Sequence, residues 1–202
     1  MQKFSSSVES AFYNKAGRYE ITTFVPYILV DNFPRLGMLT ALRFLEWVSI
    51  NPEGLISLPT GKTPEYFIKW TMHFLQHWDN RDAQKLREEH GLILAKKPEL
   101  SGLQFVQIDE FYPISPDQHN SFYYYIRNFY IDGFGLDEKR ALLVNCDDIR
   151  LAEGKSYKEI FPANLVDLSL RYRECKNELD RLQQGSVFMI DDWCSGYEKK
   201  IQ

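Results

Sequence analysis

Hydrophobic residues recur at helical spacing in three stretches of the chain. One stripe follows Pro34 and comprises Met38, Leu42, Leu45 and Val48. A second lies on one face of residues 64–78 and comprises Phe67, Trp70, Phe74, Leu75 and Trp78. A third alternates spacings of three and four and comprises Leu165, Leu168, Tyr172, Cys175, Leu179 and Leu182. Because residues three and four positions apart share a helix face, each stripe predicts a helix.

Short apolar runs between these stripes are typical of strands. Residues 55–58, 103–108 and 141–145 fit this pattern, and residues 24–30 form either a strand or an arm packed on the domain. The run at 103–108 is apolar enough to predict burial on both faces. Strands that alternate with helices predict an α/β fold, with a Rossmann-like, mostly parallel sheet and helices on both faces. We expect residues 1–30 to form an N-terminal arm or extension and residues 31–202 a single α/β domain.

Composition and charge argue against two classes of partner. The chain carries 24 basic and 28 acidic residues, a formal net charge of -4, which disfavours nucleic-acid binding. No apolar run reaches the roughly 18 residues that span a bilayer, so we expect no membrane partner. Cys146, Cys175 and Cys194 are odd in number and widely spaced, which indicates reduced thiols in a cytoplasmic protein.

The stretch LPTGKTPEYF, residues 58–67, carries candidate binding chemistry where a helix is predicted to start. Thr63 takes the expected N-cap position and Pro64 the first helical position, and free N–H groups at a helix start attract anions. Gly61 tolerates positive φ, Thr60 and Thr63 add hydroxyls, and Lys62 adds a positive charge. The loop is therefore either a small phosphate cradle or an ordinary capped strand–helix turn. It lacks the spacing of a Walker loop.

Asp109 and Glu110 directly follow the predicted strand at 103–108. Ligands bind beyond the carboxyl ends of parallel strands, so this loop and the loop after Leu58 would face one crevice. A partly desolvated carboxylate there can act as a general base, whereas the alternative is a carboxylate that caps a helix or braces the loop. Because adjacent side chains of a strand point opposite ways, we expect one carboxylate to face the crevice and the other to brace the loop.

Histidines and aromatic residues elsewhere favour structural interpretations. His119 is interpreted as a solvated loop residue, and His73 and His77 as helix-flank residues, because no third metal ligand accompanies them. Ser121 can cap a helix over residues 122–131. The aromatic residues of this helix predict packing rather than base stacking, because the chain is acidic: Phe122, Tyr123, Tyr124, Tyr125, Phe129 and Tyr130.

Two motifs in this order resemble the glucosamine-6-phosphate deaminase (isomerase) family. They are LISLPTGKTPEYF and, further along, FVQIDEFYPISPDQHNSFYYYIRNFYI. Members of that family carry a PTGxTP-type loop and an Asp-Glu-aromatic loop, each after a strand, and a later helix that starts as at Ser121 and Phe122. The resemblance covers residues 30–145, and the tail CSGYEKKIQ resembles a later helix. The related 6-phosphogluconolactonases usually have Arg after the Asp-Glu pair, so Phe111 favours the deaminase branch.

The resemblance implies an enzyme that isomerises and deaminates glucosamine 6-phosphate to fructose 6-phosphate and ammonia without metal or organic cofactor. Residues 60–63 would line the sugar-phosphate site, although most members have a small residue in place of Lys62. Asp109 would be the base that moves a proton between C2 and C1, and Glu110 would support its loop. The expected partner is a small-molecule sugar phosphate, with a homo-oligomer as a possible assembly.

The chain also departs from the family pattern. It lacks the later G-x-G-x-D-G-H motif, which carries the ring-opening histidine, and residues 146–190 exceed the usual connection. A helical pattern is still running at Gln202. We therefore expect a C-terminally truncated domain with an incomplete sheet, inactive as this chain alone. The alternatives are a non-catalytic sugar-phosphate-binding module, for sensing or assembly, and a lactonase-like relative.

Overall fold

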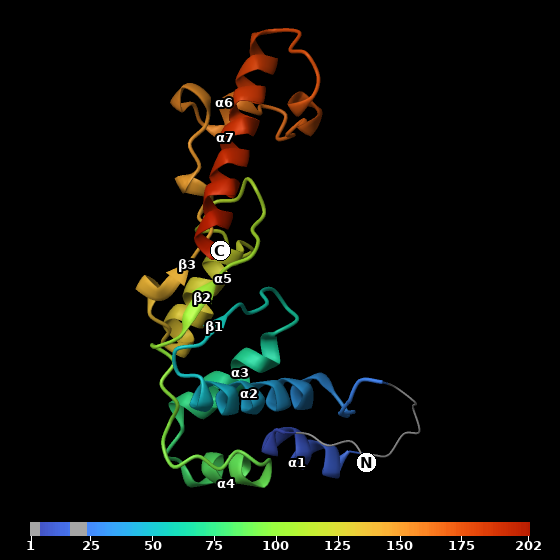
Figure 1. Ribbon diagram of the computed structural model, residues 1–202, viewed down its shortest axis with the longest axis vertical. Helices are drawn as coiled ribbons and strands as arrows, with labels where there is room; N and C mark the ends of the chain where they lie inside the picture. Colours follow the sequence, from blue (N-terminus) through green and yellow to red (C-terminus); the bar gives the residue numbers. More distant parts are fainter. Residues whose placement is uncertain (1–4, 17–23) are drawn as a thin grey trace. The chain divides into compact units, whose positions relative to one another are not determined.

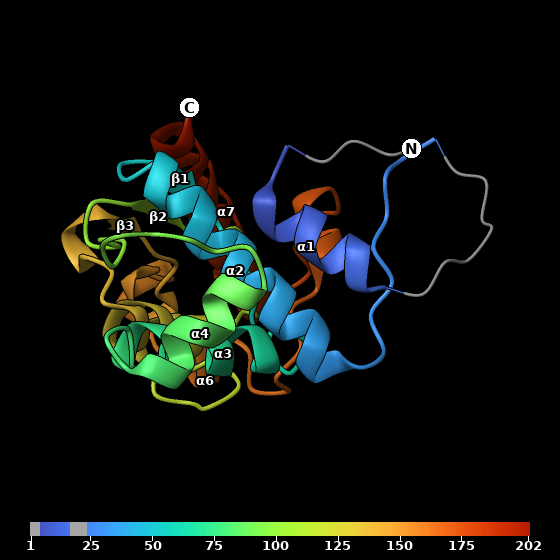
Figure 2. The same ribbon diagram turned by 90° about the horizontal axis from the view of Figure 1, so that it is seen from below.

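A computed structural model describes residues 5–16 and 24–202 (Figures 1 and 2). The chain divides into two compact units. The first comprises residues 1–108 and 124–142, and the second comprises residues 109–123 and 143–202. The arm at residues 1–30 and the single domain over residues 31–202 stay predictions.

A small parallel sheet organises the first unit. Its strands are β1 (Leu55–Ile56), β2 (Gln104–Val106) and β3 (Ala141–Leu142), in the order β1-β2-β3. Leu55 pairs with Gln104, and Phe105 pairs with Ala141. The three predicted strands are thus confirmed in shorter form, and with the helices they make a helix-rich α/β fold. The Rossmann-like arrangement with helices on both faces stays a prediction.

The expectation that residues 103–108 are buried on both faces is wrong. Leu103, Phe105 and Gln107 are buried, whereas Gln104 is exposed and Ile108 is 74% exposed. Alternate side chains of a strand point to opposite faces. Within the described ranges, packed side chains therefore cover only one face of β2.

Two amphipathic helices pack together in this unit, as their stripes predict. They are α2 (Phe33–Ile50) and α3 (Glu65–Gln76). The side chain of Asn32 caps α2 by accepting a hydrogen bond from the N–H of Arg35. A Cβ placed on Gly37 would lie 2.4 Å from Cβ of Tyr66. Glycine at this position therefore lets the two backbones approach closely.

The remaining parts of the first unit follow the sequence pattern with two refinements. Residues 81–89 form α4 (Arg81–Glu89), and the helix predicted after Ser121 begins as α5 (Phe122–Ile126). This helix continues as a π-helix, Arg127–Asp132, and Tyr130 on it is fully buried. Residues 24–30 contain no strand, so the strand alternative for this segment is wrong, and the arm alternative stays a prediction.

A carboxylate holds α1 (Ser7–Lys15) on α2. Glu46 accepts hydrogen bonds from the Ser6 hydroxyl at 2.5 Å, the Ser7 N–H at 2.9 Å and the Ser7 hydroxyl at 2.8 Å. Burial alone would raise the pKa of Glu46, but these hydrogen bonds outweigh it and hold the pKa below its ordinary 4.5. The negative charge at the start of α1 also complements the helix dipole.

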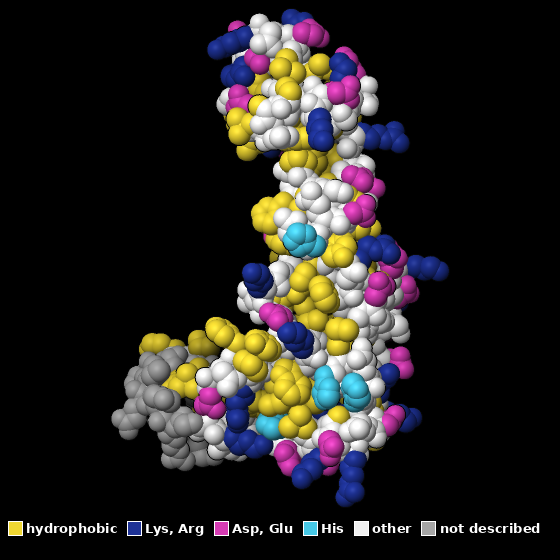
Figure 3. All heavy atoms as spheres, turned by 180° about the vertical axis from the view of Figure 1, so that it is seen from behind, with side chains coloured by type: hydrophobic (Ala, Val, Ile, Leu, Met, Phe, Trp, Pro, Cys, Tyr) yellow, Lys and Arg dark blue, Asp and Glu magenta, His cyan; other side chains and the backbone are white. Residues whose placement is uncertain are grey.

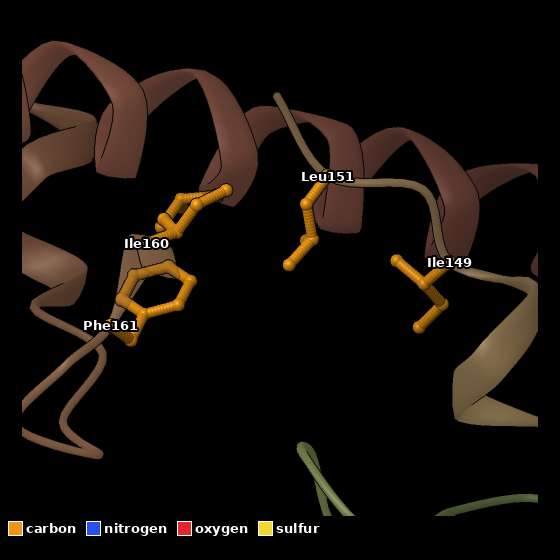
Figure 4. Close-up of a cluster of buried hydrophobic side chains, with 5 residues drawn as sticks. Ile149, Leu151, Ile160 and Phe161 are labelled. Atoms are coloured by element: carbon orange, nitrogen blue, oxygen red, sulfur yellow. The ribbon is translucent and has the colours of Figure 1, made fainter. Parts of the chain in front are cut away.

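The second unit is built around α7 (Glu178–Ile201), as the helical pattern of the tail predicts. Its buried core comprises Ile149, Leu151, Ile160, Phe161 and Val187. Four of these side chains lie along the same side of α7 in Figure 4. The short helix α6 (Tyr157–Ile160) begins with a capping box between Ser156 and Glu159.

The stripe from Leu165 to Leu182 predicts a continuous helix, and this prediction is wrong over most of its length. Residues 168–171 form a 3-10 turn, and α7 begins only at Glu178. Asp167 caps the turn, Asn177 caps α7, and Arg173 bonds Asp167 and, at 2.6 Å, Asp180. Asp and Asn side chains that bind nearby N–H groups compete with a continuous helix, so these local bonds overrode the apolar spacing.

Short 3-10 turns complete the described structure: Glu138–Arg140, Cys146–Asp148, Ala152–Gly154 and Leu168–Arg171. No helix within residues 5–16 and 24–202 is both long and apolar enough to cross a membrane.

Lowering the pH should weaken the attachment of α1 to α2, because it protonates the Glu46 carboxylate. A carboxylate with a depressed native pKa stabilises the fold above its unfolded pKa, here near 4.5, and this contribution disappears as the pH falls through the lower native pKa. We expect α1 amides to exchange faster as the pH drops below 4.5, after correction for intrinsic exchange rates. Glu46→Gln should cost about 1 kcal/mol at pH 7 and flatten the pH dependence. Exposed Glu53→Gln is the control. Unchanged pH dependence in Glu46→Gln would contradict this explanation.

Candidate functional site

The loop between β1 and α3 has the strand–turn–helix form that the sequence predicts, with a shifted helix start. Gly61 has φ +80°, and no atom lies within 4 Å of the position of a Cβ there. Pro64, not Thr63, is the N-cap residue, so the expected cap at Thr63 is wrong. The N–H of Glu65 instead bonds the carbonyl of Lys62 at 3.3 Å in a turn that precedes the helix.

This shift leaves the start of α3 without a side-chain cap. The N–H of Glu65 bonds the carbonyl of Lys62, so an external anion at this helix start would bind the N–H groups that follow Glu65, which no capping side chain accepts from. Glu65 adds a negative charge there, but Lys69 binds its carboxylate at 2.5 Å. That hydrogen bond and the lysine charge lower the pKa of Glu65. Among the described residues no carboxylate lies within salt-bridge distance of Lys62, although the Lys62 charge also helps to lower the pKa of Glu65.

A buried tyrosine fixes the beginning of the same loop. The hydroxyl of Tyr130 donates a hydrogen bond to the carbonyl of Pro59. Burial raises the pKa of Tyr130, so the phenol stays a neutral donor. The sequence predicts packing for this tyrosine but gives no sign of the bond to Pro59. Its neighbours in the aromatic run, from Phe122 to Tyr125, are half-buried, whereas Phe129 is exposed, so the aromatic run is packed only in part.

A cavity of about 1320 Å³ lies beside this loop within the first unit. Lys62 and Thr63 border it, whereas Thr60 and Gly61 do not line it. Arg43 of α2 also lines the cavity but is bound to Glu9 at 3.0 Å. Of these two cations, Lys62 is therefore the one whose charge no described carboxylate pairs with directly.

Glu110 braces the second loop through four hydrogen bonds. Its carboxylate accepts from the N–H of Phe111 at 2.9 Å, the Ser121 hydroxyl at 2.8 Å, and the N–H groups of Phe122 at 3.1 Å and Tyr123 at 2.8 Å. Glu110, and not Ser121, therefore accepts from the N–H groups at the start of α5. The fully buried Ser121 hydroxyl itself donates to Glu110. The expectation that Ser121 caps this helix is corrected accordingly.

Asp109 is exposed, so the partial desolvation that a general base requires is not present in the described structure. Asp109 and Glu110 belong to the second unit, whereas residues 60–63 belong to the first. The structure thus brings the four phosphate-loop residues together, and separately the two carboxylates. Their roles in substrate binding and catalysis stay predictions.

The other candidate residues lie outside these loops or on their exposed side. His119 is exposed, and the rings of His73 and His77 lie 4.8 Å apart on the flank of α3. Burial raises the pKa of Cys146 to about 11, and Cys146, Cys175 and Cys194 are free thiols. Within the described part of the chain, no group of three or more His, Cys, Asp or Glu side chains could hold a metal ion.

Comparison with known proteins finds weak homology to glucosamine-6-phosphate deaminases. The enzyme of Clostridium botulinum strain Loch Maree is 24% identical over 146 residues, covering 71% of this chain and 52% of that enzyme. The enzyme of strain Hall is 23% identical over the same length. The chain therefore spans about half the length of the curated relatives it matches. No family model matches it.

One solved structure is also similar, that of a monomeric glucosamine-6-phosphate deaminase described as a missing link of the NagB superfamily. The TM-score is 0.46 and the sequence identity is 17%. The match covers 58% of this chain and 42% of that chain.

Removing the Glu110 carboxylate should loosen the second loop and the start of α5. Glu110→Ala leaves the N–H groups of Phe122 and Tyr123 without this acceptor, which should cost about 1–2 kcal/mol in urea unfolding. Exposed Asp117→Ala, in the same loop, is the matched control. Equal stability of the two variants would show that the four hydrogen bonds do not hold the loop.

Proposed function

We propose that this chain is a glucosamine-6-phosphate deaminase-like domain. The observation that carries the proposal is the loop at residues 57–64, in which glycine at positive φ, an unpaired lysine and an uncapped helix start lie together. These are the components of a phosphate site. The weak homology to glucosamine-6-phosphate deaminases supports the same function.

In this proposal residues 60–63 hold the phosphate of the sugar. The N–H groups at the start of α3 and the Lys62 ammonium face a dianion, and the two threonine hydroxyls donate further hydrogen bonds. The phosphate lies remote from the reacting carbons, so its binding energy positions the sugar without taking part in the chemistry.

Asp109 is proposed as the base that moves a proton between C2 and C1 of the open-chain sugar. A proton next to a carbonyl or iminium carbon requires a base at hydrogen-bonding distance. The parallel pairing of β1 and β2 supports this role, because the chain leaves both strands at the same edge of the sheet. Glu110 supports the loop, in keeping with its four hydrogen bonds. The product would be fructose 6-phosphate with release of ammonia.

The exposure of Asp109 favours a second candidate function. A domain that keeps the phosphate loop but leaves its carboxylate in water would bind sugar phosphates without converting them. Such a module could serve sensing or assembly. We expect this behaviour, binding without turnover, from the 202-residue chain by itself. A lactonase-like activity is the weaker alternative, because Phe111 occupies the position of its usual arginine. In either case we propose a cytoplasmic protein, with a homo-oligomer as a possible assembly.

Lys62 should contribute strongly to sugar-phosphate affinity. Lys62→Ala removes a charge-assisted hydrogen bond, and we expect its dissociation constant for glucosamine 6-phosphate to rise about tenfold in isothermal titration calorimetry. Lys97→Ala, an exposed lysine of the same unit, should bind as the wild type does. Equal affinity of the Lys62 and Lys97 variants would remove Lys62 from the site.

Asp109→Asn should separate binding from chemistry. In a longer, catalytically active form of the protein, the amide keeps the shape of the carboxylate but cannot accept the C2 proton, so binding should change by less than about twofold while C2 exchange stops. Proton NMR of glucosamine 6-phosphate in D2O follows the exchange and the formation of fructose 6-phosphate. Exchange that survives in Asp109→Asn would contradict the assignment of the base. Binding without exchange by the wild-type chain would favour the non-catalytic module.

A further inference from the structure

The cavity beside the phosphate loop is larger and more apolar than a sugar phosphate requires. Its volume is about 1320 Å³, whereas pockets for small ligands typically measure about 300–1,000 Å³. Residues 26–28, α2, β1 and the start of α3 line it, mostly with aliphatic, aromatic and proline side chains. A sugar carries hydroxyls on most of its carbons, and each buried hydroxyl without a hydrogen-bond partner costs free energy. The body of the cavity therefore suits an apolar ligand better than a sugar.

One face of α2 forms a continuous wall of this cavity. Phe33, Leu36, Thr40, Arg43 and Trp47 all line it, and their spacings of three and four place them on one helix face. That face is about 21 Å long at the rise of an α-helix. Phe33 is 76% exposed and Leu36 is 44% exposed, so a ligand reaches this groove from solvent. In Figure 3 hydrophobic side chains gather on the surface of the unit that carries the grey residues, with basic side chains beside them.

The charged side chains of the lining leave one cation available to a ligand. They are Glu9, Arg43 and Lys62. Glu9 binds Arg43 at 3.0 Å, and Arg43 also contacts Glu46 at 3.5 Å. Among the described residues no carboxylate lies within salt-bridge distance of Lys62. An anionic group that reaches Lys62 would gain a charge-assisted hydrogen bond without displacing a protein partner.

Lys62 and Trp47 lie toward opposite ends of the groove along α2. A Cβ placed on Gly37, in the first half of α2, would lie 2.4 Å from Cβ of Tyr66, which follows Lys62 by four residues. A Cβ placed on Gly54, just before β1, would lie 2.4 Å from the ring of Trp47. The groove therefore has a cation toward one end and apolar surface along the rest of its length.

We propose that this groove binds a single-chain anionic amphiphile as a monomer. The anionic head group binds Lys62, and the alkyl tail lies along α2 over Leu36 and toward Trp47. Covering exposed apolar side chains with the tail removes both surfaces from water, which supplies affinity. The amphiphile shares Lys62 with the proposed sugar-phosphate site, so the two ligands would compete. Its tail contacts need no sugar chemistry, so the inference stands without the deaminase function.

Titration calorimetry of the full chain with decyl phosphate, below its critical micelle concentration, tests the proposal. Butyl phosphate keeps the head group and shortens the tail, and decyltrimethylammonium keeps the tail and inverts the charge of the head. Because each buried methylene adds affinity, decyl phosphate should bind at least about a hundredfold more tightly than butyl phosphate. It should also bind at least about tenfold more tightly than decyltrimethylammonium, because only the phosphate bonds Lys62.

Two substitutions separate the head from the tail. Lys62→Ala should weaken decyl phosphate binding about tenfold by removing the partner of the head group. Leu36→Gln, at an exposed position of the groove, should weaken decyl phosphate about tenfold and leave butyl phosphate within about twofold. Ile93→Gln is the matched control, because Ile93 is a 77% exposed residue of the same unit outside the cavity lining. It should bind decyl phosphate as the wild type does.

Three results would overturn the proposal. The first is equal affinity for decyl and butyl phosphate, and the second is equal affinity of the Leu36 and Ile93 variants for decyl phosphate. The third is binding only above the critical micelle concentration, which would assign the apolar surface to a micelle or membrane rather than to a monomer. Separate titration with glucosamine 6-phosphate distinguishes this inference from the proposed function. Binding of decyl phosphate without binding of the sugar phosphate would support the amphiphile site alone, and the reverse would remove it.

Discussion

The parallel pairing of Leu55 with Gln104 and of Ile56 with Phe105 is the constraint on which the proposed site depends. It fixes the direction of β1 and β2, so the chain leaves both strands at one edge of the sheet. The loop that begins at Ser57 and the chain that leads to Asp109 therefore start as neighbours. Had the pair been antiparallel, the two motifs would start from opposite ends of the sheet.

The two loops differ in whether a protein side chain accepts hydrogen bonds at the start of the helix that follows. The Glu110 carboxylate accepts hydrogen bonds from N–H groups at the start of α5. At the start of α3 the N-cap is proline, no side chain accepts, and Lys62 adds a positive charge. The same free N–H groups that attract an anion at one helix are thus satisfied internally at the other. This contrast explains why we place the phosphate at residues 60–63 and give Glu110 a supporting role.

The sequence predicts those elements best whose signals agree at several levels. In α2 the apolar stripe that follows Pro34 predicts a helix, and it forms with Asn32 as its cap. The stripe from Leu165 to Leu182 has spacing alone, and the caps at Asp167 and Asn177 divide it. Burial of the strand at 103–108 on one face depends on which layers pack on the sheet, which a local pattern does not contain.

The candidate site likewise combines features that the sequence predicts with features that depend on tertiary structure. Glycine at position 61 permits the positive φ that it adopts, whereas the helix start at Pro64 depends on a turn closed by the carbonyl of Lys62. The bond from Tyr130 to Pro59 joins residues far apart in the sequence and has no local signal. Exposure of Asp109 likewise reflects tertiary surroundings rather than its position after a strand.

Phosphate-dependent binding is the central claim, and calorimetry with two ligands tests it most directly. The chain is titrated with glucosamine 6-phosphate and, separately, with glucosamine under identical conditions. Our account predicts saturable binding of the phosphorylated sugar with a stoichiometry near one, and no measurable binding of glucosamine. Equal binding of both sugars, or binding of neither, would contradict a phosphate site at residues 60–63.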